Sequence, residues 1–525
     1  MSGLRPSRPH RQNIPSAATP PLKVTDLGLA YLFAGYGVLL GIGLRLYFVL
    51  SSDFPLTDGG LFFAMIRDLQ SSGYALPQYT SYNRADIPFA YPPLAFYLAG
   101  LLDSLTPIGL LDVFRFLPFL LNVLVIVAFY RFARTILQDR TAAAFALMAF
   151  PLLPTASLVF IMGGGITRSA GFAFATLMLR EAFLLNVNGG RKRILTTSAL
   201  GALTLLSHPQ MTYFAALSGV LLFLVYGHSW RAFRGSALAF IGILAITAPW
   251  WLTVIGPHGI APYMAATNIS APWYQGLVWL LTGSVTSERL FPALGLLAAI
   301  GALACIAKRE LFLPVWLSMV FAMDPRSAHQ GATVPLALLS GTAISEFILP
   351  SLTRRQAFAL LTITICLGSA SSYFEQRSDV SPLAPSERAA MQWISNNTPE
   401  GSTFLVIAPD NPGFEKSAEW FPVLANRVSV ATAQGYEWVS GGGFARQVAR
   451  TDTLRSCAAV ECVEAAAASQ GMHYTHVYIS KALPGSKAGG RIAALRASLA
   501  SDPSYPIIYD GPGAAVFVRE EKTRP

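Results

Sequence analysis

Long apolar runs separated by short polar connections fill the first three quarters of the chain. The hydrocarbon core of a bilayer is about 30 Å thick, so a helix needs about 20 mainly apolar residues to cross it. Several of the runs are short, and residues 311–323 suit a tilted or re-entrant segment as well as a span. With these included, the pattern predicts eleven spans: residues 27–50, 113–131, 141–160, 166–186, 194–208, 210–227, 236–255, 289–307, 311–323, 332–349 and 356–374.

Basic residues mark every second connection between these spans. They precede the first span and follow the second, fourth, sixth, eighth and tenth: Arg5, Arg8, Arg11 and Lys23; Arg131, Arg134 and Arg140; Arg191, Lys192 and Arg193; Arg231 and Arg234; Lys308 and Arg309; Arg354 and Arg355. Cytoplasmic loops are enriched in Lys and Arg. We therefore expect a multi-pass protein of the plasma (inner) membrane with a cytoplasmic N-terminus and an extracytoplasmic C-terminal part.

The remaining segments complete the expected domain plan. Residues 1–26 are rich in Pro, Ser and Arg and are expected to be a disordered cytoplasmic N-terminus. Residues 27–384 form the membrane domain, with two long outer connections at 51–112 and 256–288. The first of these connections contains FFAMIRDLQ and PPLAFYLAGLL, which are too short to be spans. We expect them to be helices lying on the membrane surface.

Residues 385–525 have the pattern of a small α/β domain outside the membrane. Short strands are predicted at 404–408, 476–480, 505–509 and 515–518, with DGPG at 510–513 as a hairpin turn between the last two. Helix-like stretches lie between the strands. In this domain Cys457 and Cys462 could pair if it faces an oxidising compartment.

Composition and charge limit the possible functions. The chain of 525 residues is 53% hydrophobic and only 13% charged, whereas soluble domains have about 25% charged residues. Its net charge of +10 resides in the membrane half, because residues 385–525 carry 13 basic and 13 acidic residues. Such a balance is suited to lipid headgroups and makes nucleic acid an unsuitable partner.

Ionisable residues from at least five separate segments fall at the outer face. Because charges at membrane depth are costly, such residues usually line a cavity and serve a function. Together these residues predict one polar cavity that opens outward. The alternative is that each residue simply lies at the membrane surface and extends its side chain to the lipid headgroups. Its members are Arg45, Asp53, Asp58, Arg67, Asp68, Arg84, Asp86, Arg168, His208, Asp324, Arg326 and His329.

Asp58 is the strongest catalytic candidate among them. It follows the first span, and Gly59 and Gly60 would let a ligand approach the backbone closely. A carboxylate there could deprotonate an acceptor hydroxyl. The other reading, that Thr57 or Asp58 caps the following helix, is equally open from the sequence. Arg45 could neutralise Asp58 or Asp53 from within the first span.

The motifs around Asp58 resemble those of a known superfamily. After Asp58 come Ser72-Gly73-Tyr74-Ala75-Leu76-Pro77 and Tyr91-Pro92-Pro93-Leu94-Ala95-Phe96-Tyr97; Arg115 and Pro325-Arg326 through Pro335-Leu336-Ala337-Leu338-Leu339 add to the likeness. The pattern resembles the GT-C integral membrane glycosyltransferases, particularly the protein O-mannosyltransferase and aminoarabinose transferase branch. Three features depart from it: Gly59 replaces a frequent acidic residue, the outer loop has no Asp-x-Asp, and the tail lacks Trp-Trp-Asp.

The resemblance implies an inverting transferase that moves a sugar from a polyprenyl-phosphate donor to a glycan, lipid or protein acceptor hydroxyl on the extracytoplasmic side. Asp58 would be the base, and Arg326 and His329 would hold the donor phosphate. Alternatively, Arg326 and His329 belong to a positive rim that binds lipid headgroups. Weaker substrate-binding candidates are Arg84, Asp86, Arg168 and His208, of which Arg84 and Asp86 could instead pair with each other. No cofactor is expected and no metal ligands are assigned, but a dependence on a divalent metal stays open.

Other features of the sequence have plainer interpretations. Gly163-Gly164-Gly165 suits a tight turn, and Glu419 and Glu437, each followed by Trp, suit packing, with acceptor binding as the alternative. Two other functions stay open. One is a transporter or flippase of a lipid-linked saccharide, although no inverted repeat of broken spans is evident. The other is a catalytically inactive GT-C-like assembly protein.

Overall fold

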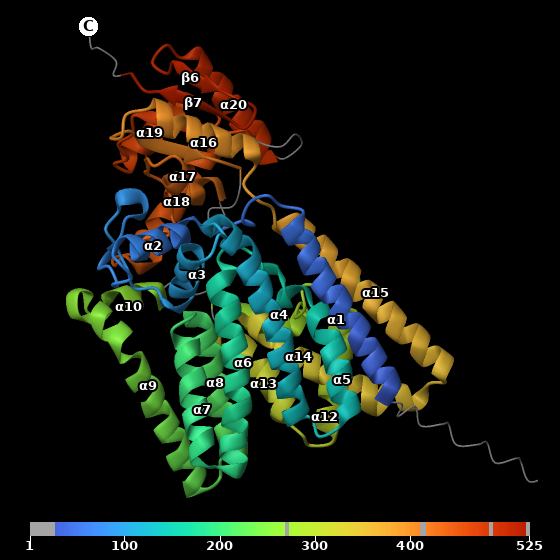
Figure 1. Cartoon of the computed structure of the whole chain (residues 1–525). Helices are drawn as coiled ribbons and strands as arrows, with labels where there is room; N and C mark the ends of the chain where they lie inside the picture. Colours follow the sequence, from blue (N-terminus) through green and yellow to red (C-terminus); the bar gives the residue numbers. More distant parts are fainter. Residues whose placement is uncertain (1–26, 268–271, 273, 410–415, 482–486, 521–525) are drawn as a thin grey trace, which may run out of the picture.

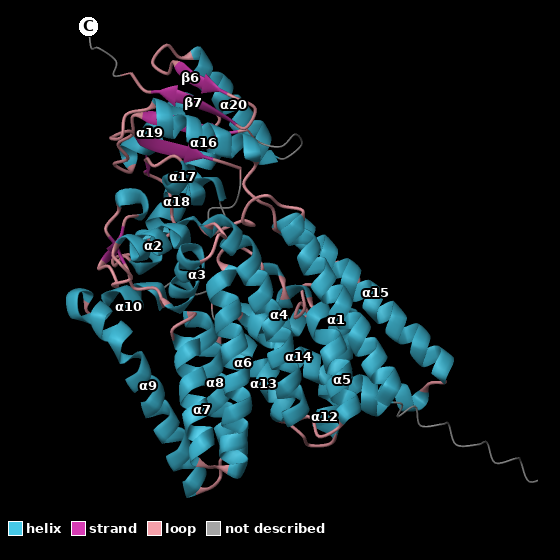
Figure 2. Ribbon diagram, viewed as in Figure 1, coloured by secondary structure: helices cyan, strands magenta, loops and turns pink. Residues whose placement is uncertain are grey.

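A computed structural model describes residues 27–267, 272, 274–409, 416–481 and 487–520. The N-terminal segment expected to be disordered, residues 1–26, lies outside the described residues. A bundle of helices forms the larger part of the molecule, and a smaller domain containing the sheet stands at one end of it (Figures 1 and 2). The fold is therefore the expected helical membrane domain with a C-terminal α/β domain.

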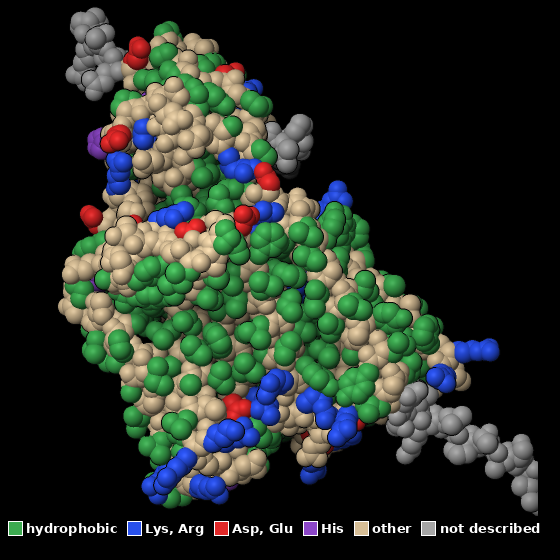
Figure 3. Space-filling view, viewed as in Figure 1, with side chains coloured by type: hydrophobic (Ala, Val, Ile, Leu, Met, Phe, Trp, Pro, Cys, Tyr) green, Lys and Arg blue, Asp and Glu red, His purple; other side chains and the backbone are tan. Residues whose placement is uncertain are grey.

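Each predicted span falls on a helix of the bundle. These helices are α1 (Leu27–Leu50), α4 (Leu110–Ile136), α5 (Arg140–Ala149), α6 (Gly165–Asn188), α7 (Arg191–Leu205), α8 (Pro209–Tyr226), α9 (Trp230–His258), α12 (Ala293–Ala307), α13 (Phe312–Met323), α14 (Ala328–Ala343) and α15 (Arg354–Asp379). The bundle carries apolar side chains over most of the face seen in Figure 3, and Lys and Arg gather at the end away from the C-terminal domain.

The expected count of eleven spans is not confirmed. Among the described residues, seven helices are long and apolar enough to cross a membrane, or eight if the broken helix that begins with α5 counts as one span. The 15 residues of α12 cover only about 22 Å at about 1.5 Å per residue, and α13 is shorter still. The apolar runs at these positions are real, but the helices that they form are short.

Prolines break the third predicted span, and the buried side chain of Arg45 donates hydrogen bonds to backbone carbonyls at the break. Residues Arg140–Leu152 and Pro154–Phe160 meet at an angle of 82°. Arg45 donates to the carbonyl oxygens of Pro151 (2.8 Å) and Ala156 (3.2 Å), and its Nε donates to Asn122. Carbonyls that lose their helical partners in an apolar region need such donors. The hypothesis that Arg45 neutralises Asp58 or Asp53 was therefore wrong, and Asp53 pairs with Arg388 instead.

The long connection after α1 folds into the two expected helices. They are α2 (Gly60–Ser71) and α3 (Leu94–Leu105), and β1 (Tyr79–Thr80) pairs with β2 (Ile87–Pro88) between them. The second long connection contains α10 (Ala261–Thr267) and α11 (Tyr274–Thr282). In Figure 1, α2, α3 and α10 lie between the bundle and the C-terminal domain.

The C-terminal domain is built on a five-stranded sheet with the order β4-β3-β5-β7-β6. The predicted strands and hairpin are present as β3 (Thr403–Ile407), β5 (His476–Ser480), β6 (Ile507–Asp510) and β7 (Ala514–Val518), and the two-residue β4 (Val428–Ser429) was not expected. Helices α16 (Pro385–Asn397), α17 (Lys416–Leu424), α18 (Gly443–Ser456), α19 (Val460–Ser469) and α20 (Lys487–Ser501) complete the domain.

The side chains of β3 point alternately to the two faces of the sheet and contribute to two separate cores in this domain. Successive side chains of a strand point to opposite faces, so Leu405 and Ile407 pack with residues of α18, α19 and α20, whereas Phe404 and Val406 pack with α16 and α17. The second core extends into the membrane domain through Phe54. The centroid of its ring lies 4.7 Å from the ring centroid of Trp420. The domain is thus joined to the segment that carries Asp58.

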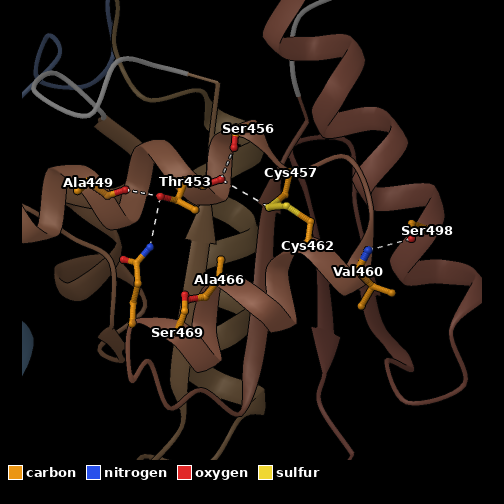
Figure 4. Close-up of a disulfide and its surroundings, with 10 residues drawn as sticks. Ala449, Thr453, Ser456, Cys457, Val460, Cys462, Ala466, Ser469 and Ser498 are labelled. Carbon is orange, nitrogen blue, oxygen red and sulfur yellow. Dashed lines mark hydrogen bonds between the residues drawn. A yellow bond between two sulfur atoms is a disulfide. The ribbon is translucent and has the colours of Figure 1, made fainter.

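A disulfide links Cys457, which is buried in the first of these cores, to the exposed Cys462. It joins the residue after α18 to α19, and the two Cα atoms are 5.5 Å apart (Figure 4). The pairing that the sequence left open is present in the structure.

Candidate active site

A cavity of about 350 Å³ lies where the bundle, the outer connection and the C-terminal domain meet. It receives side chains from the segment before α2, from the starts of α6 and α8, from the segments around the start of α14, and from α17 and the stretch before α18. Its polar lining residues are Asp58, Arg168, His208, Gln210, Arg326, Gln330, Gln434, Glu419 and Glu437. Four of the residues predicted from the sequence therefore share one cavity: Asp58, Arg168, His208 and Arg326.

Two glycines of the Gly163-Gly164-Gly165 run hold the Asp58 segment in place. The amide of Gly164 donates to Asp58 Oδ1 at 2.7 Å, and that of Gly163 donates to the carbonyl of Leu56 at 2.9 Å. A Cβ on Gly163 would lie 1.9 Å from the Asp58 carbonyl oxygen, and one on Gly164 would lie 2.6 Å from Oδ2. The run that suits a tight turn in the sequence is thus also the support of the candidate base.

The structure contradicts the reading of Asp58 or Thr57 as a helix cap. Helix α2 begins at Gly60, its N-cap is Gly59, and no side chain caps it by a hydrogen bond. Asp58 instead accepts its bond from Gly164, on a segment 106 residues away. Burial raises the pKa of Asp58, and the nearby charge of Arg168 and the Gly164 amide oppose this shift. A carboxylate with a raised pKa is a stronger base at neutral pH.

Glu419 of α17 is the second carboxylate beside this segment. Its Oε1 accepts a hydrogen bond of 2.9 Å from the amide of Gly59, and its carbonyl accepts from the hydroxyl of Tyr82 at 2.7 Å. Burial, followed by the charge of Asp58, raises the pKa of Glu419 to about 8. The sequence favoured packing for this residue. A glutamate placed directly before buried Trp420 and Phe421 was the available signal for a cavity position.

Glu437 and its neighbours close the cavity on the side of the C-terminal domain. Glu437 accepts a hydrogen bond of 2.6 Å from the amide of Gly435, and burial raises its pKa while the charge of Arg326 opposes the shift. Next to it, the ring of Trp438 lies 5.6 Å from that of Tyr91. The C-terminal domain therefore supplies two carboxylates and an aromatic wall.

The cations of the cavity come from the membrane domain. Arg168, in the first turn of α6, donates through Nη1 to the carbonyl of Val159 at 2.6 Å, and its buried Nε has no hydrogen-bond partner among the described residues. Arg326 precedes α14 and is exposed. Burial, followed by the charges of Arg168 and Arg326, lowers the pKa of His208, the N-cap of α8. Since guanidinium groups are well suited to phosphate oxygens, this is the part of the cavity that an anionic group would occupy.

The other predicted site residues lie outside the cavity lining. His329 contacts the carbonyl of Ser284 at 2.9 Å through Nε2, and its ring lies 4.4 Å from that of Trp279. Arg84 donates to the carbonyl of Glu400 at 3.1 Å, and Asp86 is exposed. Among the residues that the structure describes, Arg84 and Asp86 form no ion pair with each other.

No group of three His, Cys, Asp or Glu side chains within the described part of the chain is arranged to hold a metal ion. The cavity lining combines the carboxyl groups of Asp58, Glu419 and Glu437 with the guanidinium groups of Arg168 and Arg326.

The sequence matches no family model and no curated protein, but the fold matches solved structures over nearly its whole length. ArnT from Cupriavidus metallidurans bound to undecaprenyl phosphate is 15% identical, with a TM-score of 0.56 over 94% of this chain and 98% of that one. Arabinofuranosyltransferase AftD from Mycobacteria is 15% identical, with a TM-score of 0.58 over 96% of this chain, which spans 41% of AftD.

The archaeal oligosaccharyltransferase AglB from Archaeoglobus fulgidus, in complex with an inhibitory peptide and a dolichol-phosphate, is also similar. It is 14% identical, with a TM-score of 0.50 over 95% of this chain and 75% of that one. At such low identity the likeness establishes the fold. The chain therefore shares the fold of these solved structures, and its long apolar helices are those of a multi-pass membrane protein.

Proposed function

We propose that the protein is an inverting glycosyltransferase that moves a sugar from a polyprenyl-phosphate donor to an acceptor hydroxyl on the extracytoplasmic side. One observation carries this proposal: a single cavity in a GT-C fold brings the half-buried carboxyl of Asp58 together with the guanidinium groups of Arg168 and Arg326. A base and a phosphate-binding group are the two elements that such a transfer requires.

The reaction proceeds as one displacement at the anomeric carbon. The acceptor oxygen forms a bond to this carbon while its proton passes to Asp58, whose Oδ1 is held by Gly164. The bond from the anomeric carbon to the phosphate oxygen breaks, and the electron pair leaves with the polyprenyl phosphate. Arg168 and Arg326 stabilise the negative charge that grows on this leaving group. A single displacement inverts the configuration.

The donor class is supported by the structural neighbours. ArnT is bound to undecaprenyl phosphate, and AglB is in complex with a dolichol-phosphate. Both ligands are polyprenyl phosphates, and both proteins share the fold of this chain. A lipid of this kind suits a cavity that stands at the end of an apolar bundle.

The orientation is supported by charge and by the disulfide. The basic residues that follow the second, fourth and tenth predicted spans lie in the last turn of α4 and at the starts of α7 and α15. Figure 3 shows Lys and Arg concentrated at the end of the bundle away from the C-terminal domain. Such residues favour the cytoplasmic side. The Cys457–Cys462 disulfide fits an oxidising compartment for the C-terminal domain.

The test is release of undecaprenyl phosphate from a panel of undecaprenyl-phosphate sugars. The purified protein is supplied with an envelope extract as the source of acceptors, and the products are followed by mass spectrometry. Loss of a general base typically costs about 10² to 10⁴ in rate, so Asp58→Asn should lower turnover by this factor while the protein stays folded. Asp112→Asn is the matched control, since Asp112 is half exposed and pairs with Arg115 at the start of α4.

Two results would contradict the proposal. One is turnover by Asp58→Asn at the wild-type rate. The other is a folded wild-type protein that releases no lipid phosphate from any donor but moves lipid-linked saccharide across sealed vesicles, which would establish a carrier.

A further inference from the structure

A second cavity, of about 310 Å³, lies beside the segment that leads from α1 to Asp58. Its lining comes from the last turns of α1 and α15 and from the residues that follow each helix: Tyr47, Phe48, Ser51, Ser52, Leu56, Tyr373, Arg377, Val380, Ser381 and Pro382. None of these residues lines the cavity that holds Asp58. The two cavities are distinct.

The polar groups of this second cavity are cationic or neutral. Arg377 donates through Nη1 to the hydroxyl of Tyr373 at 3.0 Å, and its guanidinium carbon lies 5.9 Å from the centre of that ring. The hydroxyl of Ser381 accepts a hydrogen bond of 2.6 Å from the ammonium of Lys416. No carboxylate is among the lining residues. An anion would therefore meet a positive site.

The acidic residues nearest in sequence are engaged elsewhere. Glu375 and Asp379, on either side of Arg377, both pair with Arg289. Asp53, which follows Ser52, pairs with Arg388. In the described part of the chain no ion pair involves Arg377, so its guanidinium is available to a ligand.

The position of the cavity favours a lipid over a free anion. Helices α1 and α15 both meet the length and composition of a membrane span, and the cavity lies where both of them end. Tyr47, Leu50 and Phe374 are exposed around it. Tyrosines at the end of a span are typical of the headgroup level of a membrane. A ligand here meets cationic and hydroxyl groups at the ends of α1 and α15 and apolar surfaces along the two helices. This combination matches an amphipathic molecule.

We propose that this cavity binds the headgroup of an anionic phospholipid from the leaflet on the side of the C-terminal domain. The phosphodiester is held by Arg377, the headgroup hydroxyls contact Ser51 and Tyr373, and the acyl chains follow the exposed surfaces of α1 and α15. This site does not depend on the proposed glycosyl transfer.

The lipid would contact the same segment that positions Asp58. Leu56 lines the cavity and its carbonyl accepts from Gly163, whereas the amide of Thr57 donates to the carbonyl of Ser381 at 3.0 Å. The strand-like pairing of Leu56 with Pro382 belongs to the same contact. The bound headgroup therefore completes the packing around this junction between the membrane domain and the C-terminal domain.

Native mass spectrometry of the delipidated full chain tests the proposal. The protein is titrated with phosphatidylglycerol, and in parallel with phosphatidylcholine of the same acyl chains. The first molecule of phosphatidylglycerol should bind more tightly than the first molecule of phosphatidylcholine. Arg377→Gln should weaken the binding of this first phosphatidylglycerol about tenfold, the effect of losing one charge-assisted hydrogen bond. Arg355→Gln, at the other end of α15, is the matched control and should bind like the wild type.

Two further measurements separate the alternatives. Tyr373→Phe removes the hydroxyl that orients Arg377 and should also weaken the first binding, which provides a second variant if Arg377→Gln does not fold. Inorganic phosphate at millimolar concentration should not displace the lipid. The proposal is overturned if Arg377→Gln and Arg355→Gln bind phosphatidylglycerol equally, or if inorganic phosphate displaces it, which would indicate a site for a free anion.

Discussion

Glu419 accepts a hydrogen bond of 2.9 Å from the backbone amide of Gly59, although the two residues are 360 positions apart in the chain. Gly59 follows Asp58, so this bond places a carboxyl of the C-terminal domain directly beside the candidate base. A Cβ on Gly60 would lie only 2.3 Å from the carbonyl oxygen of Glu419, which shows how closely the backbones approach. The C-terminal domain is therefore part of the site.

Glu419 should make the stability of the protein fall as the pH rises. Burial and the charge of Asp58 raise the pKa of Glu419 from 4.5 to about 8. Between these values the folded protein retains a proton that the unfolded chain has released, so the stability associated with Glu419 is present at low pH and is lost as the pH rises toward 8. Glu419→Gln cannot ionise. We expect its Tm, relative to that of the wild type, to rise between about pH 5 and pH 9; a constant difference would show that Glu419 does not titrate in this range.

Gly164→Ala should separate activity from stability. The added Cβ would lie 2.6 Å from Asp58 Oδ2, and a side chain can move away where a backbone cannot. A displacement of about 1 Å costs about 10² in rate, so turnover should fall to this extent with little change in Tm. Gly163→Ala, whose Cβ would lie 1.9 Å from the Asp58 carbonyl, should lower the Tm as well.

Gly35→Ala is the control for this series, because a Cβ there meets nothing within 4 Å. Wild-type turnover in a Gly164→Ala protein would mean that the position of the Asp58 carboxylate does not matter for the reaction.

Substitutions of Arg326 should weaken the binding of the donor in a graded way. Removal of a charge-assisted hydrogen bond costs about 1.5–3 kcal/mol, so Arg326→Ala should weaken the affinity for undecaprenyl phosphate by about tenfold or more. Arg326→Lys keeps the charge without the forked geometry and should be intermediate. Arg84→Ala should bind as the wild type does, since Arg84 contacts the carbonyl of Glu400 outside the cavity. Equal affinities for Arg326→Ala and Arg84→Ala would remove Arg326 from the site.

The disulfide gives a direct test of orientation. If the C-terminal domain is extracytoplasmic, Cys457 and Cys462 should resist alkylation in intact cells until a reductant is added, as expected of a pair that is bonded in the structure. Mass spectrometry of the tryptic peptides measures this. Free thiols at both positions in freshly blocked cells would place the domain in a reducing compartment, contrary to the proposed orientation.

The pattern of apolar runs predicted where the helices lie better than how many of them cross a membrane. Hydropathy marks an apolar segment, but the length of the helix also depends on tertiary contacts. Residues 141–160 were predicted to be one span because they form an apolar run of the length that crosses a membrane. The structure breaks this segment at 82°, and the carbonyls freed by the break are satisfied by Arg45, 106 residues before Pro151.

The site was predicted in part, for a similar reason. Asp58, Arg168, His208 and Arg326 were recognisable as polar residues at the outer face, and they line one cavity. The position of Glu419 depends on the docking of α17 against the Asp58 segment, a long-range contact that no local pattern encodes. Arg326 and His329 lie three residues apart and were expected to hold the donor phosphate together. In the structure α14 begins at Ala328, and the ring of His329 contacts the carbonyl of Ser284 outside the cavity lining.

The most direct test of the proposed function is the position of the lipid phosphate in a cryo-EM map of the protein with undecaprenyl phosphate. We predict phosphate density in the cavity that contains Asp58, about 3 Å from the guanidinium nitrogens of Arg326 or Arg168. The same experiment with Arg326→Ala should give weaker density at this position. Phosphate density elsewhere on the protein, with the Asp58 cavity empty, would contradict the assignment of this cavity as the donor site.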